Sequence, residues 1–364
     1  MTGRLADEQA GIFVMSVSVF DHPVLSGLLG QDDVAVCFEI TAEIKALLTF
    51  EARLAEAEAQ CDVIPRESAA AIATACGAFN PDIKALRRAT ATDGVIVPEL
   101  VRQLRQSIAD EHAQYIHFGA TSQDAIDTGL MLRLKNILLI LDASLGRVIE
   151  RLSDLEAVYG TQILMGRTRM QRALPVTVAH RLRAWRVPLE KHQKNLADLG
   201  GHLLAVQFGG AVGTLDQLGT KGGAVRHELA KLLKLNDPQG SWHTDRTAVI
   251  ELANWLSSVT AVLGKMGADI ALMALNELDE VCLSGGGGSS AMPHKKNPVK
   301  AELLVTLGRF NAMNISGMHQ TQIHELERSG SSWSLEWMIL PQMTMAAAAS
   351  LRIAEELLMS VESF

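Results

Sequence analysis

The chain of 364 residues carries a formal net charge of −8, and 48% of its residues are hydrophobic. Its length predicts two or three domains, and its acidic balance excludes a general nucleic-acid-binding protein, which would need a basic face. The apolar run at 12–20 is too short and too interrupted by serines for a signal peptide or a membrane span. With four cysteines that lack Cys-x-x-Cys spacing, we expect a cytoplasmic protein with free thiols.

The first hundred residues favour short, Ala-rich helices that are interrupted at Pro65, Pro81 and Pro98. Proline cannot sit inside a helix without breaking its hydrogen bonds, so each of these positions predicts a helix boundary. We predict a small N-terminal helical domain over residues 1–112.

Three later segments carry apolar residues at steps of three and four, which is the period of one face of an α-helix. They are residues 131–155, 182–203 and 249–273. Each helix would span roughly 30 Å or more, and patterns that alternate as in strands are nearly absent. The sequence therefore predicts an all-α fold built on a bundle of long helices.

The first polar segment that interrupts this pattern is YIHFGATSQDAIDTG, residues 115–129. His117, Thr121, Ser122 and Asp124 lie within eight residues there. A hydroxyl at Thr121 or Ser122 can cap the following helix, and the free N–H groups of its first turn can bind an anion. A capping turn without a ligand fits the same residues, so both interpretations stay open.

The second polar segment is MGRTRMQRALPVT, residues 165–177, with Arg167, Arg169 and Arg172 within six residues. An arginine guanidinium recognises carboxylates through paired hydrogen bonds, which makes this segment a candidate anion site. A solvated basic turn is an equally good interpretation of the local pattern.

The third polar segment is SGGGGSSAMPHKKNP, residues 284–298, which begins like a flexible linker. Asn297 and Pro298 open another helical pattern, so the segment connects two bundle helices and is not a tether between domains. Its glycines let the backbone approach a ligand closely, but the P-loop pattern is not met. A surface loop without chemistry is the alternative interpretation.

In chain order, the three segments together resemble the fumarase/aspartase superfamily. Residues 288–302, GSSAMPHKKNPVKAE, match every fixed position of its signature, roughly G-S-S-x-M-P-x-K-x-N-P-x-x-x-E. The branch of bacterial 3-carboxy-cis,cis-muconate cycloisomerases is the most similar one in four shorter motifs. These are GATSQD, LPVT, WHTDR (242–246) and HELERSGSSWSLEW (324–337).

The resemblance implies a small N-terminal domain, a central long-helix bundle over 113–345, and a truncated C-terminal helical domain of which 346–364 is a short remnant. It also implies a homotetramer whose active sites draw the three segments from three different subunits. The implied substrate is a small polyanion, with no nucleic acid or membrane as partner.

Arg169 departs from the pattern of the lyases, in which the second segment reads G-R-T-H and the histidine is catalytic. A guanidinium cannot shuttle protons, so an adenylosuccinate-type lyase is the less favoured alternative. The cycloisomerase branch also lacks this histidine and typically has tryptophan. Because Arg169 differs from that residue too, a 3-sulfomuconate cycloisomerase stays open.

The resemblance implies conversion of 3-carboxy-cis,cis-muconate to 4-carboxymuconolactone, in the protocatechuate branch of aromatic degradation. A substrate carboxylate adds to the diene, and the negative charge that moves to the far carboxylate needs donors such as Lys295 and Asn297. The anionic groups of the substrate need clamps, that is, side chains that bind them and fix their orientation. The candidates for this role are Thr121, Ser122, Arg169, Gln171, Arg246 and Arg328.

By resemblance, Ser289 transfers the proton, with Lys295 and loop amides to stabilise its alkoxide. His117 is the second candidate, since the ordinary pKa of histidine suits proton transfer. No step needs a metal, and we expect no cofactor. An inactive helical scaffold is the non-enzymatic alternative, and the intact set of Ser289, Lys295 and Asn297 argues against it.

Overall fold

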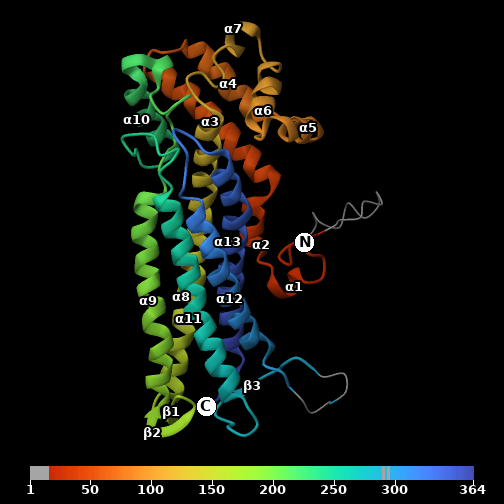
Figure 1. The fold of residues 1–364 in the computed structure, drawn as a ribbon, viewed down its shortest axis with the longest axis vertical. Helices are drawn as coiled ribbons and strands as arrows, with labels where there is room; N and C mark the ends of the chain where they lie inside the picture. Colours follow the sequence, from red (N-terminus) through yellow and green to blue (C-terminus); the bar gives the residue numbers. More distant parts are fainter. Residues whose placement is uncertain (1–15, 289–291, 293–295) are drawn as a thin grey trace.

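The computed structural model describes residues 16–288, 292 and 296–364, and its helices form an elongated rod (Figure 1). Ser289 and Lys295 lie outside the described residues. Long helices run along the rod, and they are α8 (Ser122–Tyr159), α9 (Val178–Leu203), α11 (Thr247–Met273), α12 (Val299–Gln320) and α13 (Gly330–Met359). The all-α prediction is confirmed, and the three periodic segments fall inside α8, α9 and α11.

Shorter helices make up the N-terminal part of the chain. They are α1 (Ser26–Leu29), α2 (Asp32–Ala35), η2 (Val36–Phe38), α3 (Ile40–Gln60), α4 (Arg66–Ala78), α5 (Ile83–Asp93), α6 (Val97–Arg105) and α7 (Asp110–Ala113). Pro65 precedes α4, and Pro98 lies in the first turn of α6, where its missing N–H costs no helical bond. Because α3 packs on α8 within one continuous hydrophobic core, the boundary at residue 112 stays a prediction.

The centre of the bundle depends on close packing between α11 and α12. A Cβ atom at Gly267 would lie 2.5 Å from the carbonyl oxygen of Ala301, and one at Gly308 would lie 2.9 Å from that of Thr260. In the described part of the chain, α11 is the one helix long and apolar enough to cross a membrane. Its apolar face, however, is buried in the bundle core, as expected for the core helix of a helical bundle.

The last long helix, α13, continues without a break past residue 345. Residues 346–354 include fully buried side chains such as Ala346, Ala347 and Leu351, which pack in the same core as the rest of the bundle. The predicted boundary between residues 345 and 346 therefore falls inside a bundle helix.

Among the described residues, the strands form two short antiparallel pairs. They join β1 (Ile163–Thr168) to β2 (Gln171–Thr177) and β3 (Cys282–Leu283) to β4 (Val361–Ser363). We call the end of the rod with β1 and β2 the hairpin end (Figure 1). The opposite end, with α10 (Gly222–Leu233) and the start of α8, is the α10 end; the short η3 (Asp216–Lys221) precedes α10.

Candidate active site

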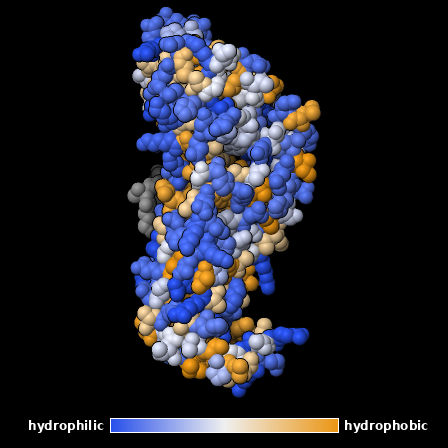
Figure 2. Space-filling view, turned by 90° about the vertical axis from the view of Figure 1, so that its left-hand side faces the viewer, coloured by the Kyte–Doolittle hydropathy of each residue, from blue (hydrophilic) through white to orange (hydrophobic). Residues whose placement is uncertain are grey.

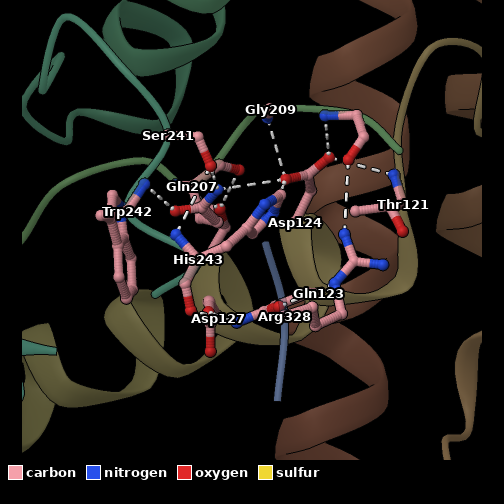
Figure 3. A network of polar contacts seen from close by, with 12 residues as sticks. Thr121, Gln123, Asp124, Asp127, Gln207, Gly209, Ser241, Trp242, His243 and Arg328 are labelled. Atoms are coloured by element: carbon pink, nitrogen blue, oxygen red, sulfur yellow. Dashed lines mark hydrogen bonds and ion pairs between the residues drawn. The ribbon is translucent and has the colours of Figure 1, made fainter. Parts of the chain in front are cut away.

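Asp124, in the first turn of α8, is the centre of a buried hydrogen-bond network at the α10 end (Figure 3). A fully buried carboxylate is costly unless its oxygens are hydrogen-bonded. Asp124 accepts hydrogen bonds from the backbone N–H groups of Thr121 (3.0 Å), Gly209 (2.9 Å) and Gly210 (2.9 Å) and from Gln207 Nε2 (3.3 Å) and His243 Nε2 (2.7 Å). This carboxylate thus joins the start of α8 to two distant loops.

Glycine is required where these loops meet. Gly210 has a φ of +68°, and a Cβ atom there would lie 2.8 Å from the carbonyl oxygen of Gly119, which itself has a φ of +65°. The segment 209–214 is therefore the part of the chain that packs against the loop carrying His117 and Thr121.

Arg246 lies in the interior of this end and is 1% exposed. It donates to Asp127 at 2.7 and 3.1 Å and to Glu336 at 3.0 and 2.6 Å, and its guanidinium lies over the ring of Trp242. Burial alone would lower the pKa of Arg246, but the charges of Asp127 and Glu336 outweigh burial and raise it. Since these carboxylates occupy its N–H groups, the expected role as a substrate clamp is replaced by one of tying α8, α11 and α13 together.

Arg328 lies in the loop between α12 and α13 and reaches the same network from the surface. Its Nε donates to Gln123 Oε1 at 3.0 Å, and one Nη donates to the carbonyl oxygen of Ala211 at 3.1 Å (Figure 3). Gln123 in turn donates to Asp127 at 3.1 Å and to the His243 carbonyl at 3.0 Å. Arg328 is exposed, so it can contact an anion at the protein surface beside this network.

His117 belongs to the same end and pairs with a residue that the sequence analysis missed. Its Nδ1 lies 2.6 Å from Glu51 Oε1, and Glu51 is almost completely buried on α3. The available signal in the sequence was an acidic residue on the apolar face of α3, between Phe50 and Leu54. Thr121 and Ser122, at the start of α8, complete the predicted residues at this end.

The second polar segment, residues 165–177, forms a β-hairpin at the hairpin end. A basic turn was one of the two interpretations of its sequence. Arg169 and Met170 form its tip with φ values of +49° and +66°, and Arg167 pairs with Glu280 at 2.5 Å. Arg169 and Gln171 are both exposed. Orange, apolar residues gather at the lower end of the face in Figure 2. The exposed apolar side chains of the hairpin are Ile163, Met170 and Leu174.

The described ends of the third segment also lie on the hairpin side of the rod (Figure 1). Gly287 and Asn297 exchange two backbone hydrogen bonds of 3.0 and 3.1 Å, which closes the base of the segment. The following helix, α12, begins at Val299, one residue later than the Asn297–Pro298 pattern predicted. Asn297 is therefore far from His117 within one chain.

Among residues 16–288, 292 and 296–364, no group of three or more His, Cys, Asp or Glu side chains is placed to hold a metal ion. The described chemistry of the two ends is that of hydrogen-bond donors, guanidinium groups and the buried histidine–carboxylate pairs His117–Glu51 and His243–Asp124.

Comparison with known proteins identifies the family. A model of the lyase family matches residues 31–314. The 3-carboxy-cis,cis-muconate cycloisomerase of Pseudomonas putida is 38% identical over 89% of this chain and 78% of that protein, and the one of Acinetobacter baylyi is 35% identical over 93% and 76%. The crystal structure of the 3-carboxy-cis,cis-muconate lactonizing enzyme from Pseudomonas putida matches with a TM-score of 0.88 and 36% identity, over 94% of this chain and 77% of that chain. The predicted superfamily is confirmed, and the chain belongs to this lyase family.

Proposed function

We propose that this chain is a cycloisomerase that converts 3-carboxy-cis,cis-muconate to 4-carboxymuconolactone. The observation that carries the proposal is the similarity to four cycloisomerases of this name, at 35–39% identity over 89–93% of the chain. Arg169 supports it against a histidine-dependent lyase, because a guanidinium does not exchange protons at ordinary pH.

In the proposed reaction, one substrate carboxylate adds to a carbon of the diene and closes a γ-lactone. The charge moves through the π system to the far carboxylate, and the carbon beside it takes up a proton. Donors that are already in place for this charge lower the barrier most. We assign this role to Lys295, Asn297 and the loop amides, and proton transfer to Ser289 or His117.

The proposed active site needs more than one subunit. Helix α8 has 38 residues and spans about 57 Å, with Ser122 at one end and the β1–β2 hairpin beyond the other. One chain cannot bring Thr121 and Arg169 to a single small substrate. An antiparallel second copy would place its hairpin end beside the α10 end of the first, and the exposed apolar residues of the hairpin suit such a contact.

We infer a homotetramer with shared sites, as in the superfamily resemblance, acting on a small polyanion in the cytoplasm. Exposed Arg328 and half-buried Ser122 of one subunit and exposed Arg169 of another bind the anionic groups of the substrate. The clamps bind the separate carboxylates, so the substrate is held in the orientation in which attack is intramolecular.

The direct test is loss of the conjugated-diene absorbance on incubation with 3-carboxy-cis,cis-muconate. We expect decay with the wild-type chain and none with Ser289→Ala, which should still bind the lactone product. The same panel includes 3-sulfomuconate, for which the additional guanidinium of Arg169 is the favouring feature, and adenylosuccinate. Faster turnover of the sulfo compound would reassign the substrate, release of fumarate would indicate a lyase, and no reaction with any of them would indicate a scaffold.

A further inference from the structure

Two buried acids lie on the same face of α3, and the first of them, Glu51, contacts His117. Glu51 and Glu58 are seven residues apart, which places them two helical turns from each other, and they are 2% and 0% exposed. Both carboxyl oxygens of Glu58 lack a hydrogen-bond partner, and so does Oε2 of Glu51. Unpartnered buried carboxyl groups are costly, so their presence behind a candidate site residue calls for an explanation.

The backbone around His117 is arranged to bring its ring onto Glu51. His117 has a φ of +62°, a left-handed conformation that is uncommon for a residue with a side chain. Arg105 fixes the preceding turn by donating to the carbonyl oxygen of Ile116 at 2.7 Å. With Nδ1 on Glu51, the ring nitrogen left for a ligand is Nε2, which no described residue hydrogen-bonds.

The charges around the ring come from several elements. Burial alone would lower the pKa of His117, but the charge and hydrogen bond of Glu51, helped by Asp124 of α8 and opposed by Arg105 of α6, raise it above its ordinary value. Burial and then the charge of Glu51 raise the pKa of Glu58 to about 9. Burial chiefly raises the pKa of Cys76 on α4 to about 12, so that thiol is neutral. At neutral pH Glu58 is thus a neutral acid.

We propose that Glu51 is the positioning residue of His117: Glu51 holds the ring with Nδ1 protonated and presents it to a polyanionic substrate as a cation. The inference rests on the proposed function for the substrate that His117 meets. A cationic imidazolium directs an Nε2–H donor at a substrate carboxylate, which a neutral ring with its proton on Nδ1 cannot do.

The test is the titration of His117 in the substrate-free protein, followed by NMR of selectively labelled histidine and assigned by the signal lost in His117→Asn. Glu51→Gln keeps an oxygen to accept from Nδ1 and removes only the charge. We expect it to lower the titration midpoint of His117 by about one unit or more. The basic limb of the kcat/KM profile should move to lower pH by the same amount.

Glu58→Gln is the matched control, with the same chemical change two turns along α3, and it should leave both midpoints in place. The proposal is overturned if His117 of the wild-type chain titrates at or below the ordinary histidine range, or if both variants shift it equally. Since the NMR titration needs no substrate, it separates this inference from the proposed function. If Glu51→Gln does not fold, the wild-type titration alone decides.

Discussion

Arg246 at the α10 end and Arg169 at the hairpin end show how differently one residue type is used in this chain. Both were expected to clamp a substrate. Arg246 is buried and gives four hydrogen bonds to Asp127 and Glu336. Arg169 is exposed at a hairpin tip and makes no hydrogen bond or ion pair with the described residues. The α10 end satisfies its buried polar groups within the chain, whereas the hairpin end presents its groups outward.

This difference predicts that substitutions at the two ends will have different signatures. Changes to the buried network of the α10 end should appear first in the free energy of unfolding. Changes at the exposed tip of the hairpin end should leave the free energy of unfolding unchanged and appear in turnover, because in the proposed assembly the partners of that tip belong to another subunit or to the substrate.

The largest effect on stability is expected for Arg246→Met. It leaves Asp127 and Glu336 buried, with like charges and no cation between them, which costs about 3–5 kcal/mol. The matched control is Arg147→Met, whose exposed pair with Glu355 also joins α8 to α13 and should cost less than about 1 kcal/mol. Urea unfolding measures both, and equal losses would contradict the contrast between buried and exposed pairs.

Glu58→Gln should stabilise the protein increasingly as pH rises. The pKa of Glu58 is raised from 4.5 in the unfolded chain to about 9 in the folded protein. The wild-type protein therefore has its full stability below pH 4.5, and its free energy of unfolding falls progressively as pH rises toward 9. Glutamine does not ionise, so the free energy of unfolding of the variant does not fall with pH in this way. Unfolding curves should show the advantage of the variant growing by about 3–4 kcal/mol between pH 5 and pH 8. A constant difference across this range would mean that Glu58 is not a buried neutral acid.

The smallest effect on stability is expected for Arg169→Ala. An exposed side chain without partners should change the free energy of unfolding by less than about 0.5 kcal/mol. The kcat/KM for the muconate should nevertheless fall by about tenfold or more, since a charge-assisted contact to the substrate is lost. Arg151→Ala, on the exposed side of α8, is the control that should change neither quantity. If Arg169→Ala instead lowers stability and keeps its turnover, Arg169 is structural.

The fold was predictable from the sequence to the extent that it depends on local periodicity. The apolar steps at 131–155, 182–203 and 249–273 lie within α8, α9 and α11, because each such face must be buried whatever its partner is. The tip of the β1–β2 hairpin was predicted as a candidate anion site or a basic turn, and not as a pair of strands. Arg169 and Met170 both take positive φ there, and no glycine in these positions signalled it.

The candidate site was predictable as three segments but not as a set of contacts. His117 pairs with Glu51 across 66 residues, and Arg246 meets Asp127 and Glu336 across 119 and 90 residues. No local pattern reports such pairings, because they depend on which helix faces pack. The exposed or buried state of an arginine follows from the same packing, so Arg246 and Arg169 looked equivalent in the sequence.

The most direct test of active sites shared between subunits is complementation between two inactive variants, one for each end. His117→Asn disables the α10 end, and Ser289→Ala disables the segment that Gly287 and Asn297 close on the hairpin side. The two variants, carrying different tags, are dissociated, mixed and reassembled, and hybrid oligomers are purified through both tags. We expect the hybrids to regain diene-consuming activity, because some sites receive both intact ends from different subunits. Hybrids that form and remain as inactive as either variant would contradict this expectation.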